Sequence, residues 1–222
     1  MFVCQGVFVS GPYAWLALFL LGCYHGINPA MGWLFAVALG LQERSTAAVL
    51  RAVLPIALGH VISIAAVVAL TVVAAAALPR APLHYGAAAI LFAFGLYRLL
   101  RLRHPRWVGM RVGFGGLALW GFLMASAHGA GLMLVPFLTA TAAPQHAMPG
   151  MPMMPAHAFA PTWSNAALVV AVHTLGYVLT TAVVAVTVYT RFGVSFLRRA
   201  WFNVDLIWSF ALIVAGIIVL AT

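Results

Sequence analysis

Long apolar runs with almost no charge constrain the fold of this chain more than any other feature. Six runs fall at about residues 13–41, 46–78, 83–100, 113–141, 163–190 and 204–221. A helix needs roughly 20 apolar residues to cross the hydrocarbon core of a bilayer, so each run is long enough, or nearly so, for one crossing. We therefore expect an all-α integral membrane protein, with six transmembrane helices in a single domain over 1–222.

The composition agrees with a membrane protein and argues against a soluble one. Hydrophobic residues make up 65% of the chain and charged residues only 6%. A soluble domain could not cover so much apolar surface with so few polar groups. All eleven basic residues are arginines, and they lie beside the apolar runs rather than in a separate basic domain. Their distribution indicates membrane topology and no nucleic-acid partner.

The distribution of the arginines predicts which side of the membrane each loop faces. Three loops, the first, third and fifth, carry nearly all of them: Arg44 and Arg51; Arg98, Arg101, Arg103, Arg106 and Arg111; and Arg191, Arg198 and Arg199. Only Arg80 belongs to the opposite side. Because positive residues collect on the cytoplasmic side, we expect these loops to be cytoplasmic and both termini to face outward from a cell membrane.

The chain has only two acids and two cysteines. Glu43 is predicted to be a solvated loop residue. Asp205 is predicted to cap the sixth helix near Arg198 and Arg199, with proton coupling as the alternative. Cys4 and Cys23 form no metal or redox motif by their spacing, and a disulfide between them is left open.

Two motifs recur in the two halves of the chain. The first run contains Y-H-G-I-N-P-A-M-G and the fourth contains A-H-G-A-G-L-M-L-V-P. The second contains L-G-H-V-I-S-I-A-A-V-V-A-L and the fifth contains V-H-T-L-G-Y-V-L-T-T-A-V-V-A-V. A repeated unit with three spans must run inverted in its second copy, because three is odd. We expect inverted repeats over about 13–101 and 113–221, an architecture that places a transport site near the membrane midplane.

Four histidines fall at one predicted depth, two from each repeat. They are His25, His60, His128 and His173. Each lies about ten to fifteen residues into its run, which is roughly 15–22 Å along a helix. We expect them to line one polar cavity; the alternative is four separate structural histidines, each bonded to a neighbouring helix. Neutral imidazole ligates Zn, Cu, Ni and Co, whereas the lack of carboxylates at this depth argues against Mg²⁺ or Ca²⁺.

The first and fourth runs also carry helix-weakening residues. They are Gly26, Asn28 and Pro29 in the first run, and Gly129, Gly131 and Pro136 in the fourth. We expect both helices to be broken or kinked there, since freed backbone groups at membrane depth are tolerated where they face protein or a water-filled cavity. A simple tilted or kinked helix is the alternative.

Three further side chains near the breaks are candidates for the site. Asn28 is expected either to contribute its carbonyl oxygen or to cap the half-helix that begins at Pro29. Met31 and Met133 follow the two His-Gly pairs. If these thioethers turn inward, they soften the site toward Cu(I); otherwise they are ordinary packing residues.

The predicted outward loop over 142–162 is rich in methionine, histidine and proline. Its candidate ligands are His146, Met148, Met151, Met153, Met154 and His157. Thioethers bind Cu(I), and flanking imidazoles suit either copper ion. The prolines keep the segment extended. We interpret the loop as a metal-gathering arm; the alternative is a flexible linker.

The layout resembles the LysE-type transporter superfamily, which includes the NicO nickel/cobalt transporters, the HupE/UreJ proteins and the CcdA thiol-disulfide carriers. The closest likeness is to NicO: G-C-Y-H-G-I-N-P stands at the place of that family's first-helix histidine-aspartate motif, and P-I-A-L-G-H-V-I-S-I resembles its Gly-His stretch. The resemblance implies His25 and Gly59-His60 as site residues. The full H-x₄-D-H pattern is absent, because no aspartate and no second histidine follow His25, and Cys23 lacks the partner found in CcdA.

These features together predict a membrane transporter of a transition-metal cation (Cu, Ni, Co or Zn) through a midplane histidine site. One alternative is a membrane redox subunit in which paired histidines ligate haem. Another is a LysE-like exporter of a small organic solute. A membrane hydrolase is disfavoured, because no serine or cysteine nucleophile is placed with a base and an acid.

Overall fold

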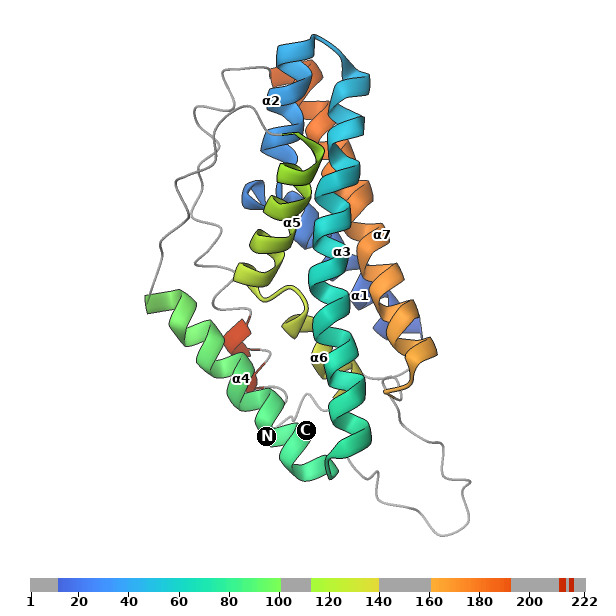
Figure 1. Cartoon of the computed structure of the whole chain (residues 1–222), viewed down its shortest axis with the longest axis vertical. Helices are drawn as coiled ribbons and strands as arrows, with labels where there is room; N and C mark the ends of the chain where they lie inside the picture. Colours follow the sequence, from blue (N-terminus) through green and yellow to red (C-terminus); the bar gives the residue numbers. More distant parts are fainter. Residues whose placement is uncertain (1–11, 101–112, 140–160, 193–211, 215, 218–222) are drawn as a thin grey trace, which may run out of the picture.

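The chain folds into helices throughout the part that its computed structural model describes, which is residues 12–100, 113–139, 161–192, 212–214 and 216–217, and no strand occurs there (Figure 1). The first half contains α1 (Pro12–Ile27), the 3₁₀ turn η1 (Pro29–Met31), α2 (Trp33–Glu43), α3 (Thr46–Ala77) and α4 (Arg80–Leu100). The second half contains α5 (Phe114–His128), the 3₁₀ turn η2 (Leu132–Leu134), α6 (Val135–Thr139), α7 (Trp163–Thr187) and the π-helical turn η3 (Val188–Phe192).

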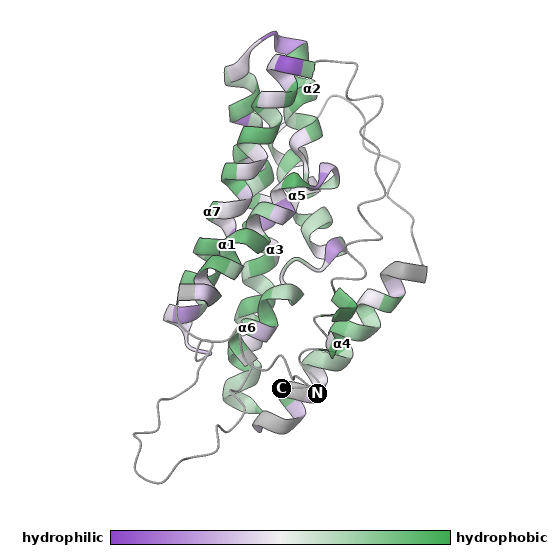
Figure 2. Ribbon diagram, turned by 180° about the vertical axis from the view of Figure 1, so that it is seen from behind, coloured by the Kyte–Doolittle hydropathy of each residue, from purple (hydrophilic) through white to green (hydrophobic). Residues whose placement is uncertain are grey.

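Some of these helices meet the requirements of membrane spans. Among the described residues, α3 and the continuous segment Trp163–Phe192 are long and apolar enough to cross a bilayer, and the bent pair α5–α6 would be a third span. Large apolar side chains such as Leu54, Leu70 and Val183 are exposed on their outer faces. Figure 2 shows the ribbons of α3 and α7 coloured mostly as hydrophobic. The predicted sixth run, 204–221, lies largely outside the described residues.

The first predicted helix is broken, as expected from its sequence. α1 ends at Ile27, and the chain passes through η1 before α2 begins at Trp33. Gly32 has a φ of 115°, a left-handed conformation that glycine adopts without steric penalty. Gly26, which we expected at the break, remains helical; a Cβ there would lie 2.7 Å from the Tyr177 carbonyl oxygen. Its role is therefore close packing.

The fourth predicted helix is broken in the corresponding place. α5 ends at His128, and Gly129 follows with a φ of 69°. The two halves of this helix are bent by 54° relative to each other. Pro136 stands in the first turn of α6, where its missing N–H is tolerated, so it starts the second half-helix rather than breaking the first.

Two pairs of helices pack most closely, α1 with α7 and α3 with α5. Glycines allow each approach. A Cβ at Gly22 would overlap the carbonyl of His173, and one at Gly176 the carbonyl of Phe19. In the other pair, a Cβ at Gly59 would overlap the Ala118 carbonyl, and one at Gly121 the Ile56 carbonyl. Small residues at contacts are the common solution for helices in membranes, because attraction there comes from close packing.

One end of the bundle carries an exposed ion pair. The helix α2 ends at Glu43, and Arg44 turns the chain with a φ of 50°. The Arg51 guanidinium donates to the Glu43 carboxylate at 2.6 Å, and both side chains are more than half exposed. Glu43 is exposed, as its predicted solvated position requires, although it pairs with Arg51 across the turn.

Substitution of Gly121 tests the close approach of α3 and α5. Gly121→Ala puts a methyl group against the backbone of Ile56, which cannot rotate away, so we expect the free energy of unfolding to fall by about 1–3 kcal/mol. Gly115→Ala in the same helix is the control, since nothing lies within 4 Å of its added Cβ. Unfolding in mixed detergent measures both. Equal stabilities for the two variants would contradict the close contact.

Candidate functional site

Three of the four predicted midplane histidines lie against one another. His25 stands in the last turn of α1, His60 in the middle of α3 and His173 in α7. Their ring centres are 4.8 Å apart for His25 and His173, 5.6 Å for His25 and His60, and 5.7 Å for His60 and His173. All three side chains are fully buried. We refer to these three residues as the histidine cluster.

The fourth histidine, His128, holds a place in α5 like that of His25 in α1. It is also fully buried at the C-terminal end of its helix, just before the break. Its Nδ1 bonds the Met124 carbonyl at 2.8 Å, as Nδ1 of His25 bonds the Leu21 carbonyl at 3.0 Å. His128 therefore repeats, before the second break, the local position that His25 has before the first.

The bond between His25 and Leu21 determines which ring nitrogen is protonated. A carbonyl oxygen can only accept a hydrogen bond, so Nδ1 carries the proton in the neutral ring and Nε2 carries the lone pair. Histidine ligands of metals usually donate their second nitrogen to a carbonyl or carboxylate in this way. His25 therefore has the tautomer that a ligand through Nε2 requires.

The other two members of the cluster contribute nitrogens that protein groups do not satisfy. Neither nitrogen of His60 has a hydrogen-bond partner among the described residues, and both are buried. The nitrogens of His173 make no hydrogen bond of good geometry there either, although the Leu18 carbonyl lies toward the ring. Buried polar atoms without partners are unfavourable, so these positions can gain free energy by binding a ligand.

The cluster is not arranged around an ion. In the described part of the chain, no group of three or more His, Cys, Asp or Glu side chains has the arrangement that holds a metal. The rings of His60 and His173 are nearly parallel, with an angle of 11° between their planes. Rotation of the imidazole rings would be needed before they could share one ion.

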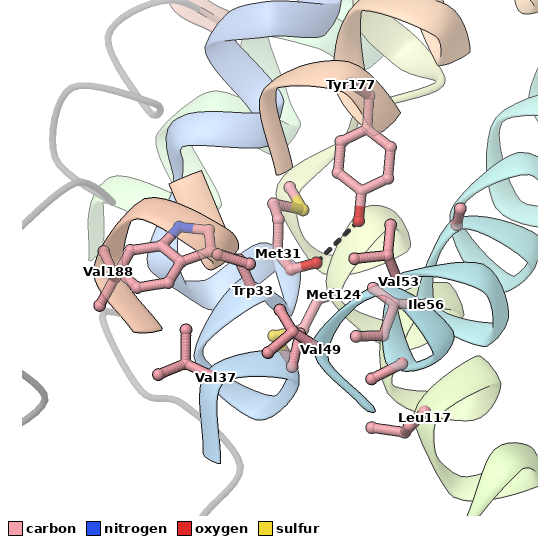
Figure 3. Packing of buried hydrophobic residues seen from close by; sticks show 14 residues of the cluster. Met31, Trp33, Val37, Val49, Val53, Ile56, Leu117, Met124, Tyr177 and Val188 are labelled. Atoms are coloured by element: carbon pink, nitrogen blue, oxygen red, sulfur yellow. Dashed lines mark hydrogen bonds between the residues drawn. The ribbon is translucent and has the colours of Figure 1, made fainter. Parts of the chain in front are cut away.

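Tyr177 joins the histidine cluster to the break after α1. Its ring stacks on His60, with ring centres 3.9 Å apart and planes within 10°. Its hydroxyl donates to the Met31 carbonyl at 2.8 Å, which Figure 3 shows as a dashed line. Tyr177 is not among the residues that the sequence predicts for the site. Its position four residues after His173, on the same helix face, was the signal that it would lie beside the cluster.

Side-chain donors satisfy the backbone that the break frees. The Trp33 indole donates to the Ile27 carbonyl at 2.9 Å, and the Trp120 indole donates to the Ala30 carbonyl at 3.1 Å. The Asn28 side-chain oxygen accepts from the Ala30 N–H at 3.0 Å. Asn28 therefore caps the turn that begins at Pro29, which is one of its two expected roles.

The two methionines near the breaks pack among apolar side chains. Met31 is buried in an apolar cluster with Trp33, Ile56 and Tyr177. Met133 is buried in a different cluster, with Leu91 and Leu212. These positions match the packing alternative for both residues.

Apolar layers lie along the helices on either side of the histidine cluster. Apolar residues lie one helical turn before and after His60 and His173. Ile56 and Tyr177 belong to the same cluster as Met31, and Ile64 and Val169 belong to a second cluster. On α1, Leu18 belongs to the second cluster, with Ile64 and Val169. The histidines are thus enclosed between two apolar layers.

Some predicted features lie outside the described residues. They are the loop ligands His146, Met148, Met151, Met153, Met154 and His157, together with Cys4, Asp205, Arg101, Arg103, Arg106, Arg111, Arg198 and Arg199. Cys23 is described and is a free thiol.

Comparison of the chain with protein-family models, with curated proteins and with solved structures finds no significant match. The function is therefore inferred from the histidine cluster and the two helix breaks.

The bond from Tyr177 to Met31 yields a prediction for stability. Tyr177→Phe keeps the ring that stacks on His60 but leaves the buried Met31 carbonyl without its donor, so we expect a loss of about 1–3 kcal/mol in the free energy of unfolding. Tyr97→Phe, at a half-exposed position, is the control. Thermal unfolding in detergent measures both variants, and unchanged stability of Tyr177→Phe would show that the bond contributes nothing.

Proposed function

We propose that this protein is a membrane transporter of a transition-metal cation, with the ion bound by His25, His60 and His173. The observation that carries the proposal is the buried contact of three imidazoles, two of which, His60 and His173, have ring nitrogens without a hydrogen-bond partner among the described residues. Transport needs a site that binds an ion inside the membrane and releases it to either side. His128 would add a ligand from the second repeat.

The spacing of the rings supports an ion-sized site. With metal–nitrogen bonds of about 2.0–2.1 Å and about 1.1 Å from nitrogen to ring centre, imidazoles around one ion have centres about 5.2–5.5 Å apart. The cluster has separations of 4.8, 5.6 and 5.7 Å. Binding would therefore require turning the rings within their present positions, with little movement of the helices.

The packing of the helices supports two inverted repeats within six spans. If α1 corresponds to α5 and α3 to α7, the close pair α1–α7 corresponds to the close pair α5–α3. His25 and His128 then match in their bonds to the carbonyl four residues earlier and in the break that follows. In this arrangement, loops one, three and five are cytoplasmic and both termini face outward. The Met/His-rich loop would gather metal on the outward side.

The apolar layers and the breaks suggest how access could alternate. In the proposed mechanism, the apolar clusters on either side of the histidines would close both paths to the site in this conformation. Opening one side requires its layer to separate while the other stays closed. The half-helices after each break are the parts that can tilt, because the backbone is already interrupted there.

The haem alternative fits the geometry less well. A haem held by two histidines places the porphyrin between their rings. The rings of the cluster lie against one another, and the Tyr177 ring stacks on His60. A porphyrin would have to displace these contacts.

Transport into proteoliposomes tests the proposal. We expect the protein to move Cu, Ni, Co or Zn ions, and His60→Ala or His173→Ala to lower the rate at least tenfold, because ligand loss typically weakens metal affinity or activity by that order. The control is His104→Ala, which removes a histidine from the predicted third loop.

Two results would contradict this function. One is metal flux that is equal in the cluster variants and the control. The other is a Soret band in the purified protein that is lost with the cluster histidines, which would establish the haem alternative. Flux of an organic solute without metal flux would support the LysE-like exporter instead.

A further inference from the structure

No acidic side chain of the described residues lies at the histidine cluster, and this limits the charge of the ion that the cluster can hold. The whole chain has two acidic residues. Glu43 pairs with Arg51 on the exposed turn between α2 and α3, and Asp205 lies outside the described residues. None of the apolar runs that contain His25, His60, His128 or His173 includes a carboxylate. A bound cation would thus keep its full charge in a site of neutral ligands.

The apolar surroundings of the cluster raise the free energy of a charged ion bound there. The histidines are fully buried between apolar layers that include Leu18, Ile64 and Val169 on one side and Ile56 on the other. The free-energy penalty of placing an ion in a medium of low dielectric rises with the square of its charge, so it is about four times larger for a divalent ion than for a monovalent one. Neutral nitrogen ligands do not offset this difference.

Among the described residues, the side chains beside the cluster offer no further ligand that would balance a divalent ion. Zinc sites with three histidines add a bound water or hydroxide in an open fourth position, and nickel or cobalt often take oxygen ligands as well. Here Tyr177 lies flat against His60, and Ser63, one turn along α3, has its hydroxyl paired with Ser126 at 2.8 Å. A monovalent soft cation that is bound by three imidazoles, in contrast, needs no further ligand.

We infer that the cargo of the histidine cluster is a monovalent soft cation, Cu(I), rather than divalent Ni, Co or Zn. This inference rests on the proposed transport of a metal ion and specifies its charge. Binding involves no change of oxidation state, so the copper must reach the protein already reduced. Imidazole is a competent ligand for copper, and silver(I) has the same charge and similar ligand preferences.

Competitive binding to the purified full-length protein tests this inference. The background should be the variant in which Met148, Met151, Met153 and Met154 are all changed to Ser, because loop thioethers would also take Cu(I). Under anaerobic conditions we expect one equivalent of Cu(I) or Ag(I) to bind, with affinity at least 100-fold above that for Zn²⁺, Ni²⁺ or Co²⁺. Adding His25→Ala, His60→Ala and His173→Ala should abolish this binding. X-ray absorption should show nitrogen ligands around copper.

A single exchange tests the charge argument without removing the cluster. His173→Asp adds one negative charge, and His173→Asn is its neutral control of the same size. We expect the ratio of Zn²⁺ affinity to Cu(I) affinity to be at least tenfold higher in the Asp variant than in the Asn variant. Both variants should retain the unfolding temperature of the parent within a few degrees, as a check that they are folded. Equal ratios in folded variants would overturn the inference.

The outcomes separate this inference from the proposed function. Divalent ions bound by the histidines as tightly as Cu(I) would overturn the inference and leave metal transport standing. Metal binding that is unaffected by loss of the three histidines would overturn both. Cu(I) binding that disappears entirely when the loop methionines are replaced would also overturn the inference, because it would place the copper site outside the cluster.

Discussion

Backbone groups that are buried away from water need hydrogen-bond partners inside the protein, and the break after α1 shows how this chain supplies them. Three carbonyls near the break accept hydrogen bonds from Trp33, Trp120 and Tyr177, which come from three different helices. An interrupted helix at this depth is stable only with such partners. Because Tyr177 also stacks on His60, the same set of bonds that stabilises the break positions one wall of the histidine cluster.

Close packing of the helices brings the histidines together. The glycine contacts between α1 and α7 draw His25 toward His173, and α3 adds His60 from its middle. A larger residue at Gly22 or Gly176 would push the first pair apart and widen the cluster. The separation of these rings is therefore a consequence of glycines that carry no reactive side chain.

Much of the local structure was predictable. The helix over 46–77 and the break at Asn28-Pro29 followed from apolar length and from helix-weakening residues. The detailed roles at the breaks were harder to predict. Gly26 serves packing while Gly32 takes the left-handed turn, and Pro136 starts a half-helix. Glycine and proline mark an interruption, but neighbouring helices decide which residue bends, because a position pressed against another backbone must stay helical.

The sequence by itself determined the apolar helices, the places where two of them break, and the scarcity of acidic residues. These properties depend on local composition and chain connectivity. Only the tertiary structure decided that His25, His60 and His173 touch, that Tyr177 covers His60, and that Met31 faces an apolar cluster. Depth along a span places side chains at one level of the membrane. The rotation and contact of the helices determine which of them meet, and those depend on packing between residues far apart in the chain.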